Sequence, residues 1–139
     1  FSNKIKKEKF NIGIVWQGSH SHPNDHNRSL ELERFYFLTQ MKNVQLYSLQ
    51  IEETEQLNNV PSGIDIINLG KNFTDFYDTA CAIKNLDLVI SIDTSVVHLS
   101  AALGVQTFVL LPFHPDWRWG LDSDSSDWYE KMKIFRQEK

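Results

Sequence analysis

A strand, a short polar turn and a helix follow one another within Leu86–Gly104, and this segment constrains the fold more than any other. Leucine, isoleucine and valine dominate Leu86–Ile92, as in a strand that is buried on both faces. Residues 93–95 (DTS) make the turn, a helix is predicted over Val96–Leu103, and Gly104 is a typical helix stop. Strands of this kind occur in parallel sheets covered by helices, so the segment favours an α/β fold.

The rest of the chain repeats the same alternation of apolar runs and helical spacing. Besides Leu86–Ile92, the predicted strands are Asn11–Trp16, Val44–Leu49, Ile64–Leu69, Thr107–Leu111 and Lys133–Arg136. Besides Val96–Leu103, the predicted helices are Leu30–Met41, Glu52–Asn58 and Thr74–Asn85, the last with Thr74 as its N-cap. Right-handed crossovers then give a three-layer, doubly wound parallel sheet with strand order 3-2-1-4-5 and a sixth strand at the edge.

A chain of 139 residues is long enough for one domain with a buried core. Residues 1–10 are lysine-rich and lack an apolar centre, so we expect a linker or N-terminal extension there and a single domain over 11–139. The chain does not begin with methionine, and we expect it to be a piece of a longer polypeptide.

Charge and cysteine usage exclude some classes of protein. The net charge of −4 argues against a nonspecific nucleic-acid binder, which needs a basic face, but it allows a local phosphate site. Cys81 is the single cysteine and cannot form an internal disulfide, so we expect a reducing, cytoplasmic location. No apolar run reaches the roughly 18 residues that a transmembrane helix needs.

Two polar loops are expected to meet at one edge of the predicted sheet. In this strand order the first and fourth strands are neighbours, and residues 17–29 and 93–95 follow them at the edge where ligands bind in such folds. The helix after residue 95 offers free N–H groups and a partial positive charge, and His98 lies near its start. Arg28 adds a planar cation that suits phosphate. The sequence therefore predicts a phosphate or diphosphate site.

The same residues also allow other kinds of site. The chain has neither G-x-G-x-x-G after its first strand nor a P-loop motif. Asp93, Ser95 and His98 could suggest a hydrolytic triad, but no G-x-S-x-G elbow carries the serine. Asp93 is also a favoured helix cap, and a cap and a ligand site can coexist at one turn.

A metal site is a further alternative in the first loop. His20, His22 and His26 with Asp25 would supply ligands to a metal-dependent hydrolase. Their spacing matches no common zinc pattern, so we expect no bound metal.

Aromatic residues allow two interpretations. Trp117 and Trp119 follow the fifth strand on the ligand side, where they would stack on a base or sugar. Alternatively, Trp117, Trp119 and Trp128 would close the edge of the domain. Phe73, Phe76 and Tyr77 are expected in the core.

The run ISIDTSVVHLSAALG resembles the D-[TS]-x-x-x-H-L-x-x-A-L-G signature of glycosyltransferase family 9, the heptosyltransferase-like enzymes. GIVWQGSHSHPNDHNRSLELERF is similar to that family's first C-domain strand, loop and helix. LPFHPDWRWGLDSDSSDWYEKMKIFRQ resembles a variant found after tetratricopeptide repeats in bacterial proteins. The resemblance covers most of the chain and implies a GT-B architecture, in which two Rossmann-like halves face a cleft. This chain would be the C-terminal half, which binds the nucleotide-sugar donor.

The resemblance also implies roles for particular residues. The donor diphosphate would rest on Thr94, Ser95 and His98, with Asp93 alongside, and Arg28 would stand where relatives usually have a lysine. Relatives usually have glycine at the position of Ser95, which affects how closely the backbone approaches the donor.

Further contacts would come from the loops around this site. Gly18 and Ser19 open the first loop, where glycine lets the backbone approach a ligand. Gln50, at the tip of the second strand, would lie near the nucleoside, and Trp117 or Trp119 would line the nucleoside or sugar.

The catalytic base is expected outside this chain. In the family it belongs to the acceptor-binding N-terminal half, so the isolated domain is expected to bind donor weakly and to turn over little. The expected partners are a nucleotide sugar, an acceptor of unknown identity, and an upstream half or tetratricopeptide repeats, without a metal cofactor. A non-catalytic interaction module that keeps the fold is the alternative.

Overall fold

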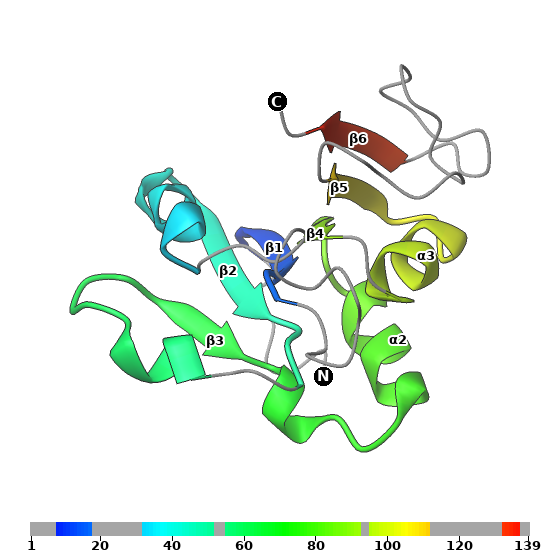
Figure 1. Ribbon diagram of the computed structural model, residues 1–139, viewed down its shortest axis with the longest axis horizontal. Coiled ribbons are helices and arrows are strands. Elements are labelled where there is room, and N and C mark those ends of the chain that lie inside the picture. The colour runs from blue at the N-terminus through cyan, green and yellow to red at the C-terminus, as the bar shows by residue number, and fades with distance from the viewer. Residues whose placement is uncertain (1–7, 18–31, 52–54, 93–94, 112–131, 137–139) are drawn as a thin grey trace.

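The computed structural model describes residues 8–17, 32–51, 55–92, 95–111 and 132–136. In this part of the chain, strands form one parallel sheet with the order β3-β2-β1-β4-β5-β6 (Figure 1). The strands are β1 (Phe10–Val15), β2 (Val44–Ser48), β3 (Ile66–Asn68), β4 (Leu88–Ile92), β5 (Gln106–Leu111) and β6 (Met132–Arg136). The predicted order, with its sixth strand at the edge, is confirmed.

Helices cover both faces of this sheet, which makes the domain a doubly wound α/β structure with three layers (Figure 1). The α-helices are α2 (Phe76–Lys84) and α3 (Ser95–Ala102), and the 3₁₀-helices are η1 (Leu32–Gln40), η2 (Glu55–Asn59) and η3 (Gly70–Asn72). The apolar spacing predicts a helix over Leu30–Met41. The described part of that segment is a 3₁₀-helix that ends at Gln40, and residues 30 and 31 lie outside the described residues.

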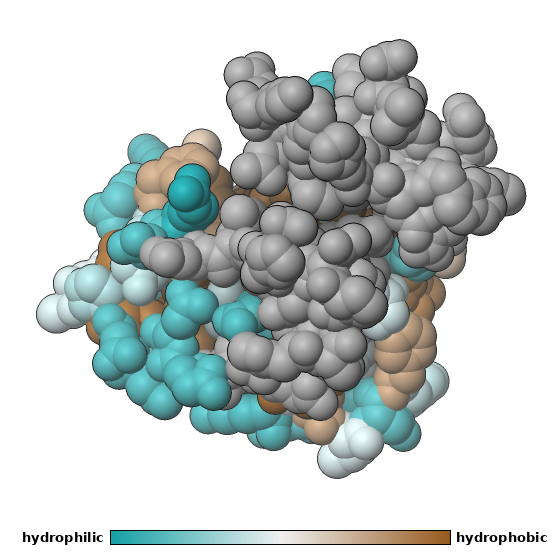
Figure 2. Space-filling view, in the orientation of Figure 1, coloured by the Kyte–Doolittle hydropathy of each residue, from teal (hydrophilic) through white to brown (hydrophobic). Residues whose placement is uncertain are grey.

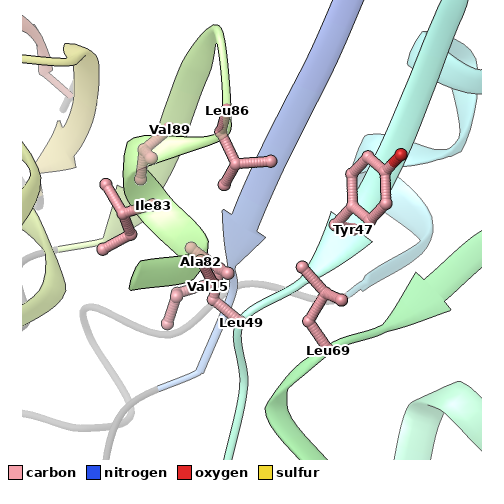
Figure 3. Packing of buried hydrophobic residues seen from close by; sticks show 8 residues of the cluster. All are labelled: Val15, Tyr47, Leu49, Leu69, Ala82, Ile83, Leu86 and Val89. Carbon is pink, nitrogen blue, oxygen red and sulfur yellow. The ribbon is translucent and has the colours of Figure 1, made fainter. Parts of the chain in front are cut away.

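Alternate residues of each central strand face opposite layers, as a pleated strand requires. Ile12 and Ile14 of β1 pack under η1 with Leu32 and Phe35. Val15 points the other way, into the cluster beneath α2 and α3. Figure 3 shows this second cluster between the strands and α2; its buried members are Val15, Tyr47, Leu49, Leu69, Ala82, Ile83, Leu86 and Val89.

The first turn of α2 differs from its prediction in two ways. The N-cap is Asp75, whose carboxylate accepts a hydrogen bond from Asp78 N at 3.0 Å, whereas the sequence favoured Thr74. Phe76 and Tyr77 are 54% and 73% exposed, so the expectation that both lie in the core is wrong. They belong to the first turn of α2, which begins before its buried residues Thr79, Ala82 and Ile83.

Other large apolar side chains are exposed on other elements. Figure 2 shows hydrophobic atoms at the surface near η1, the helix that includes Phe37. Phe37 is 66% exposed, and Met41, which directly follows η1, is 53% exposed. Single exposed apolar residues are normal on folded proteins and assign no function here.

The helix α3 ends at Ala102, one residue before its predicted end at Leu103, and Gly104 follows as the predicted stop. Gly104 has a φ of +79°, a left-handed conformation that glycine adopts without strain. Its N–H donates to Ala101 O at 3.0 Å, and the next N–H, of Val105, donates to Ser100 O at 3.1 Å. This cap turns the chain from α3 into β5.

Candidate anion site at the carboxyl edge of the sheet

The strands β1 and β4 are paired neighbours, and the chain leaves them towards opposite layers. Val15, the last residue of β1, is in register with Ser91 of β4. From β1 the described chain continues to Gln17, while β4 ends at Ile92 and α3 begins at Ser95. The carboxyl ends of two adjacent strands whose connections diverge form the position at which doubly wound folds bind ligands.

The start of α3 lies at this edge and has the electrostatics of an anion site. The residues of α3 are all described, and none of those in its first turn is acidic. The first N–H groups of a helix lack partners within the helix, and together they act as roughly half a positive charge. Ser95 is exposed at the first position, and His98 is partly buried one turn later. The arrangement is suited to bind phosphate.

The side chain of Gln50 lies at the same edge, just beyond the end of β2, and is 5% exposed. Its Oε1 accepts hydrogen bonds from Trp16 N at 3.3 Å and from Gln17 N at 3.4 Å. Its Nε2 donates to Gln17 O at 2.7 Å. The Gln50 amide is therefore bonded to the backbone that leaves β1, and its predicted contact with a nucleoside stays a prediction.

Sequence reasoning missed a second glutamine, Gln56 of η2. Its Oε1 accepts from Leu32 N at 2.7 Å, and its Nε2 donates to Gln17 Oε1 at 3.3 Å. The short polar helix that carries Gln56 was predicted, but a glutamine on a polar helix gives no signal of such contacts.

The structure brings Ser95 and His98 together on one turn of α3 and places Gln50 against Gln17. The other predicted site residues lie outside the described residues, and their roles stay predictions: Gly18, Ser19, Arg28, Asp93, Thr94, Trp117 and Trp119.

The described part of the chain holds neither a cluster of metal ligands nor a membrane-spanning helix. Across the described ranges, no three His, Cys, Asp or Glu side chains gather as metal ligands would. His20, His22, Asp25 and His26 lie outside those ranges, so the metal alternative stays open. No helix within the described part of the chain is long and apolar enough to span a membrane.

Comparison with solved structures identifies the fold. A glycosyl transferase family 9 structure from Veillonella parvula DSM 2008 superposes with a TM-score of 0.68 at 16% identity, covering 99% of this chain and 38% of that one. The E. coli heptosyltransferase WaaC, solved with ADP-2-deoxy-2-fluoro heptose, gives a TM-score of 0.66 at 13% identity, covering 96% of this chain and 39% of that one. No protein-family model and no curated protein matches the sequence.

These matches define the class of fold. The parallel sheet with its helices is that of one Rossmann-like half of a GT-B glycosyltransferase. More particularly, one of the two solved structures is a glycosyl transferase of family 9 and the other is a heptosyltransferase. This chain spans about two-fifths of their length, which corresponds to one domain.

Proposed function

We propose that this chain is the donor-binding half of a family 9-like glycosyltransferase and binds a nucleoside diphosphate sugar at the start of α3. The observation that carries the proposal is the position of that helix start, beside the carboxyl end of β1. The fold is shared with a family 9 glycosyl transferase and with a heptosyltransferase that was solved with ADP-2-deoxy-2-fluoro heptose.

The proposed chemistry is stabilisation of the departing diphosphate. When a sugar leaves its donor, negative charge grows on the diphosphate oxygens. Preorganised N–H groups and hydroxyls that point at those oxygens lower the barrier. The first turn of α3 supplies such groups, with Ser95 and His98 as side-chain donors. We expect Arg28 and Thr94 to add charge and hydrogen bonds, without a metal ion.

The remaining predicted residues would complete the donor site. Gly18 and Ser19 would let the first loop approach the diphosphate, and Asp93 would lie beside it. Trp117 or Trp119 would line the nucleoside or sugar. The sequence resemblance supports a cytoplasmic enzyme whose catalytic base lies on an N-terminal half, with that half or tetratricopeptide repeats upstream of this domain.

Titration of nucleoside diphosphates tests the proposal. With ADP, GDP, UDP and CDP added separately to ¹⁵N-labelled protein, we expect amide shifts at Ser95 and His98 for at least one nucleotide. An absence of shifts at these residues for all four, up to millimolar concentration, would remove the proposal.

A charge placed at the helix start sharpens the test. Ser95→Asp favours the helix itself, because an acidic residue in the first turn interacts well with the helix dipole. It also repels phosphate, so we expect affinity to fall about tenfold or more, a change of 1.4 kcal/mol per tenfold. The matched control is Ser62→Asp, on an exposed turn before β3. Equal affinities in the two variants would contradict the proposed position of the diphosphate.

A further inference from the structure

A pair of buried hydroxyls joins α3 to the neighbouring strand β5. Ser100 lies on α3 and Thr107 lies on β5, and neither side chain is exposed to solvent. The distance between Ser100 Oγ and Thr107 Oγ1 is 2.7 Å, which is typical of a hydrogen bond between hydroxyls. The pair is therefore a direct side-chain contact between the helix and the sheet.

The donor in this contact can be assigned from a second hydrogen bond. Thr107 Oγ1 donates to Val105 O at 2.9 Å. A hydroxyl carries one proton, so the Thr107 hydroxyl must accept in its contact with Ser100. Ser100 is thus the donor to Thr107, and the Val105 N–H donates to Ser100 O at 3.1 Å. These three hydrogen bonds form a closed set between α3 and the start of β5.

This closed set controls the tilt of α3. The helix spans eight residues and begins at Ser95, three positions after the end of β4 at Ile92. Ser100 lies about 7.5 Å from Ser95 along the helix axis. A tilt of about 10° around Ser100 would therefore move the start of the helix by about 1 Å. A misplacement of about 1 Å can cost up to about 100-fold in a site that depends on orientation.

We propose that Ser100 and Thr107 are positioning residues for the donor diphosphate. The inference rests on the proposed function, in which that ligand binds the first N–H groups of α3. Hydrogen bonds weaken steeply as the angle at the proton falls, so the direction of those N–H groups affects the affinity for phosphate. The hydroxyl pair fixes this direction by holding α3 against β5. Ser100 and Thr107 act through the helix and need not touch the ligand.

Two substitutions and their combination separate positioning from stability. Ser100→Ala removes the donor, and Thr107 keeps its bond to Val105 O. Thr107→Val keeps the shape of the side chain but leaves the buried Ser100 hydroxyl without its acceptor, which destabilises the fold. The double variant removes both hydroxyls, and replacing both partners of a buried hydrogen bond can be nearly neutral for stability. Thr79→Val is the matched control, because it makes the same change at a buried position of α2.

Calorimetry measures the affinity for ADP, GDP, UDP and CDP well below the melting temperature of each variant. For the tightest of these nucleotides we expect a loss of about tenfold in Ser100→Ala and in the double variant. Urea denaturation should show that the double variant is more stable than Thr107→Val, although its affinity stays low. Residual dipolar couplings of the α3 N–H groups should change in the double variant, because the helix tilts relative to the sheet. Thr79→Val should keep the affinity and these couplings.

Each outcome decides the matter. Wild-type affinity or unchanged couplings in the double variant overturn the positioning role and leave the proposed function intact. An affinity that recovers together with stability, or an equal loss in Thr79→Val, indicates a general effect of stability and also overturns that role. An absence of binding to the wild-type protein overturns both proposals. If Thr107→Val or the double variant does not fold, Ser100→Ala decides alone, and unchanged affinity in that variant contradicts the positioning role.

Discussion

At the scale of single residues, Gly70 shows how closely the backbone packs next to the candidate site. A Cβ built on Gly70 would collide with the carbonyl oxygen of Gln50 and lie 2.7 Å from its carbonyl carbon. These are main-chain atoms at the point where Gln50 turns to bond Gln17, so they cannot swing aside as a flexible side chain would. The site's edge is therefore held by contact between the backbones that follow β2 and β3.

Gly70→Ala should lower the free energy of unfolding by about 3 kcal/mol, the upper end of the usual range for overpacking. Gly63→Ala is the control, because that position has open space but a φ of +94°. There a side chain should cost only about 1 kcal/mol, from backbone strain alone. Urea denaturation measures both values. A Gly70→Ala protein as stable as Gly63→Ala would show that the backbone yields at this contact.

Thr79 carries a polar group that its surroundings do not satisfy. It is 1% exposed on α2, and within the described part of the chain its hydroxyl has no hydrogen-bond partner. Thr79→Val keeps the shape and removes the buried hydroxyl, so we expect a gain of about 1 kcal/mol in the free energy of unfolding. Valine and threonine have similar helix propensities, so the gain reports the hydroxyl.

Thr39→Val is the matched control for that substitution. The Thr39 hydroxyl donates to Tyr36 O at 2.7 Å, so its removal should stabilise nothing. Thermal unfolding of both variants checks the comparison. A Thr79→Val protein that is no more stable than wild type would show that the hydroxyl finds a partner in solution.

Residue types alone indicated part of the candidate site. Ser95 and His98 follow from a strand-to-helix motif that can be read along the chain. The bonding of Gln50 to Gln17 and the contacts of Gln56 depend on distances between elements that are far apart in sequence. No local pattern encodes such contacts, because a glutamine makes the same local sequence whether its amide faces solvent or another backbone.

At the scale of elements, the start of α2 is held by linked side-chain caps. Asp75 accepts from Asp78 N at 3.0 Å, and the carboxylate of Asp78 accepts from Thr74 N at 2.8 Å and from Thr74 Oγ1 at 2.6 Å. The hydrogen bonds from the side chain and backbone of Thr74 lower the pKa of Asp78. The negative form of Asp78 is thus the one that the folded protein favours.

The pH dependence of stability follows from that shift. Because the pKa of Asp78 is lower in the folded state than in the unfolded one, its contribution is complete above the unfolded value, near 4. It is lost as the pH falls from there through the folded pKa. Asp78→Asn should therefore flatten the decline of unfolding free energy as the pH falls below about 4.

Asp75→Asn is the control for that prediction. Asparagine still accepts from Asp78 N as an N-cap, so the bonds from Thr74 to Asp78 should persist, and with them the decline attributed to Asp78. Urea titrations at each pH measure the slopes. An Asp78→Asn slope equal to that of wild type would mean that the cap at Thr74 is not formed in solution.

Strands were predicted more accurately than helix ends for a physical reason. The core strands, such as Leu88–Ile92, are apolar because both faces are covered, so composition alone marks them. The ends of helices depend on single hydrogen bonds. Thr74 and Asp75 are both good caps, and only the geometry of Asp78 decides between them.

At the scale of the whole molecule, chain order and the handedness of crossovers set the strand order. They place β1 beside β4 although Phe10–Val15 and Leu88–Ile92 are far apart in sequence. This juxtaposition brings the end of β1 and the start of α3 to one edge of the sheet. It could be predicted because few topologies satisfy the rule that crossovers between parallel strands are right-handed. What occupies that edge depends on side chains and ligands, which the rule does not address.

The transferase activity of this chain by itself can also be predicted at the scale of the whole molecule. Sugar transfer needs both a base near the acceptor hydroxyl and stabilisation of the departing diphosphate, and the site that we propose at α3 would supply only the second. The chain also spans only 38% and 39% of its two solved relatives. With ADP-heptose, ADP-glucose or UDP-glucose, we therefore expect the chain to release nucleoside diphosphate no faster than buffer alone does. Chromatography of samples taken over several hours measures this release. A general base typically adds about 10²–10⁴-fold to a rate, so its presence would be plain.

Ser95→Asp is the control for this prediction. If the wild-type chain releases diphosphate and Ser95→Asp does not, these residues contain a complete catalytic set. The expected division of the catalytic groups between two halves would then be wrong.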